Sequence, residues 1–156
     1  LWDVFRRDPT PQKGIFTALP AFALCETMAW YILTGVCERF PRLKIVFVEP
    51  ALFWVPGFLR LLDDRMHQHY EFPGVNELPS TYFKRQMAAT DVNEPGVRDF
   101  VDTLGADNVM WSTDFPHPCC NWPNSQTLVE RQFAGFTEEE THKITWANGA
   151  RMYGIS

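Results

Sequence analysis

The chain has 156 residues, 46% of them hydrophobic and 15% aromatic, which is enough for one globular domain with a sizeable core. Its formal net charge is -5 and its basic residues are scattered, with no cluster longer than a pair such as Arg6-Arg7, so nucleic acid is excluded as a partner. No apolar run approaches the ~18 residues that span a bilayer, and the N-terminus lacks the pattern of a secretory signal. We therefore expect a cytoplasmic protein that does not bind membranes.

The first half of the chain predicts a helix, a strand and a second helix. Apolar residues at spacings of three, four and seven favour a buried helix over residues 21–34, and Gly35 would end it. Residues 43–48 form a near-continuous apolar run that stops at Glu49-Pro50, which is typical of a parallel strand covered on both faces. Residues 52–70 carry apolar side chains at helical spacing with charged residues between them, so an amphipathic helix follows.

The second half repeats this alternation. Residues 80–90 predict a short helical turn, opened by Ser80, that passes into a strand ending near Thr90. A helix over residues 95–104 would end at Gly105, and the run "VMWS" at 109–112 predicts another short buried strand. Thr137 and Glu140 stand in capping-box register at the start of a last helix, residues 137–155.

Alternating strands and helices imply a parallel α/β sheet, because parallel strands need crossover connections. About three such units are present. In parallel α/β folds the chemistry collects at the carboxyl ends of the strands. Here these ends carry Glu49, Thr90 and Asp114, so all three predicted strands end in a polar residue where a site is expected.

Asp114 is the first candidate for chemistry, since it follows an apolar strand and precedes a proline-containing turn. A carboxylate in this position can bind a divalent metal or take a proton from water. It can also cap the turn through its side chain, and the local pattern favours this structural role.

Three segments change that weighting, because their order and spacing resemble a known family. They are "GVCERFPRLKIVFVEPALFWVP", "WSTDFPHPCCNWPNS" and "TEEETHKITWANGARMYGI". Together they resemble the C-terminal half of the amidohydrolase-related (amidohydrolase 2) family, the metal-dependent barrel hydrolases and decarboxylases that include aminocarboxymuconate-semialdehyde decarboxylase. The resemblance covers roughly residues 22–155 and is most specific at "STDFPHP".

The resemblance implies a (β/α)8 TIM-type barrel of which residues 1–156 form a single partial domain, with about the last three strands. It also implies that Asp114 is the metal ligand and proton-transfer base, and that the complete protein uses a divalent metal, Zn²⁺ or Mn²⁺. The implied reaction is hydrolysis of a C–N, C–O or C–C bond, or non-oxidative decarboxylation, of a small carboxylic acid or amide.

The family's metal-binding histidines have no counterpart in this chain. "HQH" at His67 to His69 has the letters of a His-x-His pair, but it ends an amphipathic helix, where two such side chains point about 200° apart. A metal site needs about three or four protein ligands, and Asp114 is the one confident candidate. We therefore expect this chain alone to hold no metal.

Two further residues are candidates for the site. Glu49 stands where decarboxylases of the family carry a His, and it could orient a ligand, accept a proton or bind a substrate hydroxyl, or only cap the helix that follows. This difference weakens a specific prediction of decarboxylation. His117 could bind a substrate carboxylate or hold Asp114 in place, or simply be exposed.

The four cysteines fit reduced structural thiols better than a disulfide framework or a metal site. Trp122, Asn124 and Ser125 are expected to shape a pocket, and Arg39, Asn148 and Arg151 to belong to the framework.

The sequence thus supports two hypotheses. In the first, the chain is the C-terminal portion of a cytoplasmic, metal-dependent enzyme with Asp114, Glu49 and His117 in its site. In the second, it is a non-catalytic partial barrel or assembly module. A homo-oligomer is expected in either case, because three strands leave two open edges that template association.

Overall fold

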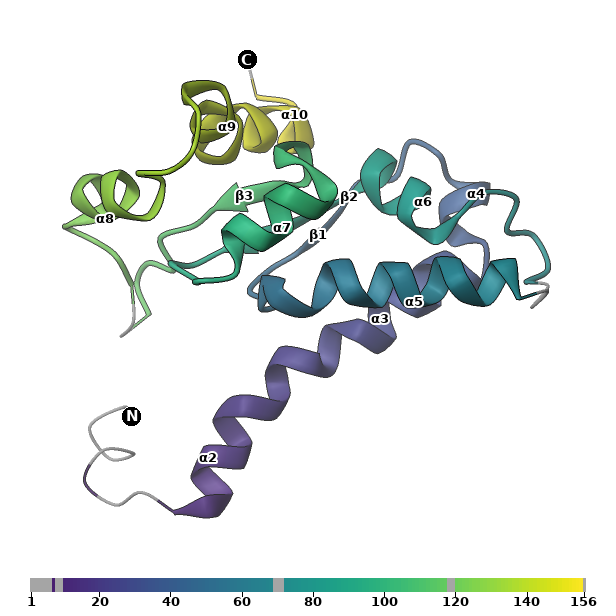
Figure 1. Cartoon of the computed structure of the whole chain (residues 1–156), viewed down its shortest axis with the longest axis horizontal. Helices are drawn as coiled ribbons and strands as arrows, with labels where there is room; N and C mark the ends of the chain where they lie inside the picture. Colours follow the sequence, from purple (N-terminus) through teal and green to yellow (C-terminus); the bar gives the residue numbers. More distant parts are fainter. Residues whose placement is uncertain (1–6, 8–9, 69–71, 118–119, 156) are drawn as a thin grey trace.

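The computed structural model describes residues 7, 10–68, 72–117 and 120–155, and its centre is a three-stranded parallel sheet (Figure 1). The strands are β1 (Ile45–Phe47), β2 (Met87–Asp91) and β3 (Val109–Trp111), in the order β1-β2-β3. Strand β1 pairs with the first part of β2, where Ile45 is opposite Met87, and β3 pairs with its last part, where Val109 is opposite Ala89. The start of β3 is therefore shifted by two residues along β2 relative to the start of β1. This sheet confirms the predicted α/β class, and all three predicted strands form.

Helices connect the strands and cover the sheet. Before β1 lie α2 (Pro11–Ala18), η1 (Leu19–Phe22), α3 (Ala23–Leu33) and α4 (Val36–Arg39). Between β1 and β2 lie η2 (Leu52–Trp54), α5 (Val55–His67) and α6 (Pro79–Gln86), and between β2 and β3 lie α7 (Val97–Leu104) and η3 (Ala106–Asn108). After β3 come α8 (Ser125–Gln132), α9 (Glu138–His142), the π-helical η4 (Lys143–Ala147) and α10 (Asn148–Tyr153).

The main core lies between the sheet and the helices α5, α6 and α7. Phe83 and Phe100 are fully buried there, with their ring centroids 6.2 Å apart in an edge-to-face arrangement. Met87, Ala89 and Val109 point into this core from the strands. The opposite face of the sheet carries a smaller cluster of Ala88, Met110 and Met152. Val48, directly after β1, is 58% exposed, so the cover of that face is incomplete.

The N-terminal helices differ most from the sequence prediction. The proline-rich lead-in forms α2 and η1, because Thr10 caps α2 by accepting the Lys13 N–H at 3.3 Å and Pro11 occupies the first turn, where no N–H is needed. The helical segment Pro11–Leu33 projects from the sheet (Figure 1) and is mostly exposed. Its length and composition would allow it to cross a membrane, which is weak evidence, since core helices of soluble proteins pass the same test.

Other helices follow the prediction with small shifts. Gly35 ends α3 with φ 72°, and a Cβ on Gly35 would lie 2.6 Å from the Gly74 carbonyl oxygen, so glycine is required there. The capping box of Thr137 and Glu140 opens α9 as expected. Helix α6 begins at Pro79, so Leu78 and not Ser80 occupies the N-cap position, and the helix is longer than the single turn predicted. Helix α8 was not predicted.

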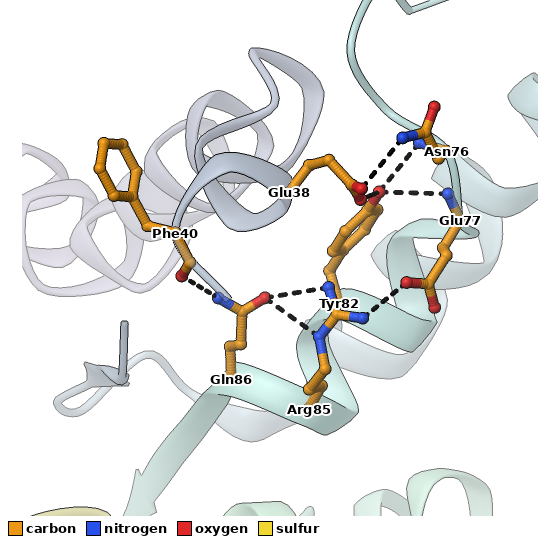
Figure 2. A network of polar contacts seen from close by, with 7 residues as sticks. All are labelled: Glu38, Phe40, Asn76, Glu77, Tyr82, Arg85 and Gln86. Atoms are coloured by element: carbon orange, nitrogen blue, oxygen red, sulfur yellow. Dashed lines mark hydrogen bonds and ion pairs between the residues drawn. The ribbon is translucent and has the colours of Figure 1, made fainter. Parts of the chain in front are cut away.

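A polar network fixes the amino ends of β1 and β2 (Figure 2). The buried Tyr82 of α6 accepts the backbone N–H groups of Asn76 and Glu77 at 2.9 and 3.1 Å and donates to the Glu38 carboxylate of α4. One residue before β2, the buried Gln86 donates to the Phe40 carbonyl at 2.8 Å. Because the network lies before both strands, it belongs to the framework and not to the carboxyl-end site.

Candidate functional site

Glu49 and Asp114 approach one another at the carboxyl edge of the sheet. Glu49 follows β1 by two residues and Asp114 follows β3 by three, and parallel strands bring these ends to the same edge. Together with Glu94, beyond the end of β2, they line a cavity of about 440 Å³. Phe53, Gly96 and His117 also line it. All three residues predicted for the site, Asp114, Glu49 and His117, therefore lie in one pocket.

The Asp114 carboxylate faces the pocket. Its Oδ2 lies 2.8 Å from Nδ1 of His117, and the Asp114 side chain is 21% exposed against 46% for His117. Two backbone hydrogen bonds close the turn after β3. The His117 N–H donates to the Asp114 carbonyl at 2.8 Å, and the Asn121 N–H donates to the Thr113 carbonyl at 3.0 Å. The local sequence pattern favoured a turn cap by the Asp114 carboxylate, but backbone hydrogen bonds stabilise the turn. The carboxylate contacts the His117 side chain.

Glu49 forms a side-chain hydrogen bond with Asp114. This bond, partial burial and the negative charge of Asp114 raise the pKa of Glu49, and the nearby His117 acts in the opposite direction. A hydrogen bond between two carboxyl groups requires a proton on one of them. The pair can therefore present one acid and one base to a bound molecule, which is the arrangement that general acid-base chemistry needs.

The backbone around the pocket adopts left-handed conformations. Among the residues that the structure describes, the non-glycine residues with positive φ are Glu49, Ala51, Asn93 and Asp114. Each follows the carboxyl end of a strand. Such conformations are unfavourable for residues with a Cβ, by about 1–2 kcal/mol each, and they cluster at functional sites. This clustering marks the same edge of the sheet as the carboxyl pair does.

Other candidates lie elsewhere. His67 is exposed at the end of α5, as expected for a solvated helix end, and His69 lies outside the described residues. Cys25, Cys37 and Cys120 are free thiols, and Cys119 is not among the described residues. Trp122 is exposed and packs its ring edge-to-face on Phe115, with centroids 5.6 Å apart. Asn148 is buried and donates to the carbonyls of Ala106 and Val109, which confirms its framework role.

Sequence reasoning missed the polar cluster at the end of β2. Asp91, the last residue of this strand, is fully buried, and its Oδ1 accepts the Glu94 N–H at 2.8 Å. Gln132 of α8 donates to Asp91 Oδ2 at 2.6 Å. The sequence "TDVNE" directly after an apolar segment could have indicated this polar cluster. The contact of Asp91 with Gln132, 41 residues further along the chain, is visible only in the fold.

We predict that Asp91 makes the fold less stable as the pH rises from about 4 to about 6. Burial raises the pKa of Asp91 from 3.8 to about 6, against the opposing hydrogen bonds from Glu94 and Gln132. Below the ordinary pKa both the folded and unfolded forms are protonated. Between the two pKa values only the unfolded form ionises, so the free energy of unfolding falls by up to about 1.4 kcal/mol per pH unit.

Urea unfolding of wild type and Asp91→Asn at pH 4 and pH 7 measures this effect. The amide remains neutral, and Gln132 can turn its unpaired Oε1 toward the new N–H group. The stability of the variant relative to wild type should therefore rise by roughly 2 kcal/mol between the two pH values. Asp64→Asn, at an exposed position of α5, is the control and should show no such change. An equal pH dependence in wild type and Asp91→Asn would contradict the prediction.

The carboxylate oxygens of the pocket have the chemistry of ligands for a hard divalent cation. Asp114 and Glu49 converge on one cavity, so these donors fit part of such a site. Within residues 7, 10–68, 72–117 and 120–155, no group of three or more His, Cys, Asp and Glu side chains could hold an ion by itself. A complete site therefore needs ligands in addition to these two.

Comparison with known proteins is consistent with this geometry. A search of curated proteins gave no match. An amidohydrolase from Mycobacterium avium subsp. paratuberculosis K-10 is 22% identical, with a TM-score of 0.75 over 86% of this chain and 34% of its own. 5-Carboxyvanillate decarboxylase from Sphingomonas paucimobilis is 30% identical, with a TM-score of 0.65 over 81% of this chain and 38% of its own.

A third solved structure holds a metal. Dihydroxybenzoic acid decarboxylase from Polaromonas sp. JS666, with bound manganese and the inhibitor 2-nitroresorcinol, is 20% identical, with a TM-score of 0.67 over 96% of this chain and 48% of its own. This chain therefore spans between a third and a half of the length of these three structures. They share its fold, and the three parallel strands correspond to part of their TIM barrels.

The family assignment covers most of the sequence. The amidohydrolase family model matches residues 17–155, which include all three strands and every residue of the pocket. The family and its structural neighbours are enzymes. By this match, and by the fold and carboxyl-edge site that accompany it, the chain belongs to the amidohydrolase family.

Proposed function

We propose that the chain forms one side of the active site of a metal-dependent enzyme that cleaves a bond in a small carboxylic acid or amide. The observation that carries this proposal is the convergence of Asp114, Glu49 and His117 on one cavity at the carboxyl edge of a parallel sheet. The remaining strands and metal ligands would come from the rest of the complete protein, since the chain spans less than half of the three solved structures described above.

Asp114 would hold the metal and act as the general base. The metal, when bound, would supply positive charge that stabilises negative charge developing on the substrate. The precedent for the metal itself is manganese in the neighbouring decarboxylase structure. Either manganese or zinc suits the proposal.

The carboxyl pair would move the proton. In a hydrolysis, Asp114 would accept a proton from the attacking water, and Glu49 would give one to the leaving group. In a decarboxylation, the bond between the substrate carbon and its carboxylate group breaks and the carboxylate leaves as CO2. The electron pair of that bond stays on the substrate carbon, and Glu49 would supply the proton that forms the new C–H bond. The 30% identity to 5-carboxyvanillate decarboxylase supports the second reaction, and the carboxyl pair serves both.

His117 would orient Asp114 and contact the substrate. Its Nδ1 is held by Asp114, and its side chain is about half exposed at the cavity, so the rest of the ring is accessible to a ligand. A protonated imidazole there would attract the carboxylate of an acidic substrate.

A second candidate function is a non-catalytic assembly module. The observation in its favour is the incomplete ligand set within the described residues, together with the two edge strands β1 and β3. On this proposal the open edges would pair with another copy of the chain, giving a homo-oligomer without turnover.

Metal removal separates the two candidates. We expect the complete protein to contain about one divalent ion per chain, to lose activity after dialysis against a chelator, and to regain it with manganese or zinc. The 156-residue chain by itself should retain no stoichiometric ion, since two ligands are too few. Elemental analysis of both proteins and an activity screen with aromatic carboxylic acids are the measurements.

Full activity in the metal-free complete protein would contradict the metal-dependent mechanism. A complete protein that binds no metal and remains inactive on carboxylic acids and amides would favour the assembly module. Asp114→Ala is the matched variant for the metal analysis, because it should remove the ion from the complete protein.

A further inference from the structure

The loop that carries Glu49 is held in an unfavourable conformation. It runs from Glu49 to Leu52, the first residue of η2, and has positive φ at Glu49 (51°) and Ala51 (61°). Neither residue is glycine, so both prefer other backbone conformations. A loop of this kind keeps its shape only where the surrounding structure fixes it.

Two side chains from the end of β2 bind this loop at both of its ends. Thr90 Oγ1 accepts the Glu49 N–H at 2.8 Å, and Glu94 Oε2 accepts the Leu52 N–H at 2.6 Å. Thr90 is buried, so its hydroxyl has little water to compete for the bond. The neighbouring strand thus provides the acceptors that the two loop N–H groups need.

A second layer fixes Glu94 itself. Its N–H donates to Asp91 Oδ1 at 2.8 Å, and Gln132 Nε2 donates to Asp91 Oδ2 at 2.6 Å and to the Glu94 carbonyl at 3.3 Å. Gln132 belongs to α8, the helix that follows the Asp114 turn. The bonds therefore join the end of β2 to the Glu49–Leu52 loop on one side and to α8 on the other.

We propose that Thr90 and Glu94 are positioning residues that hold the Glu49–Leu52 loop and so direct the Glu49 carboxyl group toward Asp114. Thr90 acts through the loop and does not line the cavity, whereas Glu94 holds the loop and also lines the cavity. This inference rests on the proposed function for its effect on turnover, because Glu49 must take part in the reaction for its position to matter. The contacts with the loop N–H groups are independent of that function.

The first measurement is hydrogen exchange by NMR on the complete protein. Thr90→Val keeps the size of the side chain and removes the acceptor, so exchange at the Glu49 N–H should accelerate by about tenfold while Leu52 changes little. Glu94→Met should have the converse effect, with faster exchange at Leu52. Thr90→Ser restores an acceptor and should restore slow exchange at Glu49.

The second measurement is steady-state kinetics with metal content determined for each variant. Thr90→Val should lower kcat by about five- to tenfold with KM and metal content unchanged, since a misplaced Glu49 carboxyl group affects the chemical step more than substrate binding. Thr90→Ser should recover most of kcat. Thr103→Val is the matched control, because the Thr103 hydroxyl only donates to the Asp99 carbonyl on the exposed side of α7.

Unchanged exchange at Glu49 in Thr90→Val would overturn the inference, whatever the activity. Faster exchange with wild-type kcat, in a protein whose turnover does depend on Asp114, would also overturn it. The proposed function is tested separately by Asp114→Asn, so the failure of one can be told from the failure of the other.

Discussion

Replacement of Asp114 by Asn in the complete protein should lower kcat by about 10²-fold or more. Asn has nearly the same shape and keeps one oxygen that can contact a metal, but it cannot accept a proton as a carboxylate does. It also changes the contact with the Glu49 carboxyl group and the contact of Oδ2 with His117 Nδ1 at 2.8 Å. Steady-state kinetics on metal-replete protein measures the effect.

The control is Asp64→Asn, which removes a carboxylate from the exposed side of α5 and should leave kcat unchanged. Metal content must be determined for both variants, so that a lost ion is distinguished from a lost base. Near-wild-type turnover in metal-replete Asp114→Asn would leave Asp114 with a structural role. Glu49 would then be the next candidate for the base, and Glu49→Gln the variant that tests it.

The strands and their polar ends could be predicted because their signals are local. Each strand is a short apolar run, and Glu49 and Asp114 follow such runs directly. The rule that parallel strands place their carboxyl ends at one edge then brings the two carboxylates together without any knowledge of tertiary contacts. The approach of Glu49 to Asp114 is the geometric consequence, although the hydrogen bond between them was not foreseen.

The missed features depend on contacts between distant residues. Thr90 was recognised only as a strand end, because its bond to the Glu49 N–H spans 41 residues of sequence. Glu94 reads as the start of a helix until the fold places it beside Leu52, 42 residues earlier. Helix α2 was missed for a different reason, since Pro11 is compatible with the first turn of a helix as well as with a loop.

Substitutions of framework residues should lower the stability of the fold and leave kcat unchanged, and we expect the largest such effect at Asn108. This side chain is 2% exposed and lies just before β3. Its Nδ2 donates to the carbonyls of Met87, Lys84 and Phe83 at 2.7, 2.9 and 3.3 Å. It therefore joins the end of α6 and the start of β2 to the start of β3, at the amino side of the sheet.

Asn108→Ala should lower the free energy of unfolding by about 3–4 kcal/mol, because three carbonyls lose a donor and two of these bonds are buried. Urea unfolding measures this loss, with Asn124→Ala as the control, since Asn124 is exposed and makes no side-chain cap bond at the start of α8. At a temperature where the variant stays folded, its kcat should equal that of wild type, because Asn108 and Asp114 lie at opposite ends of β3. A loss below about 0.5 kcal/mol would show that these bonds contribute little to stability, whereas a large fall in kcat without loss of stability would place Asn108 in the catalytic machinery.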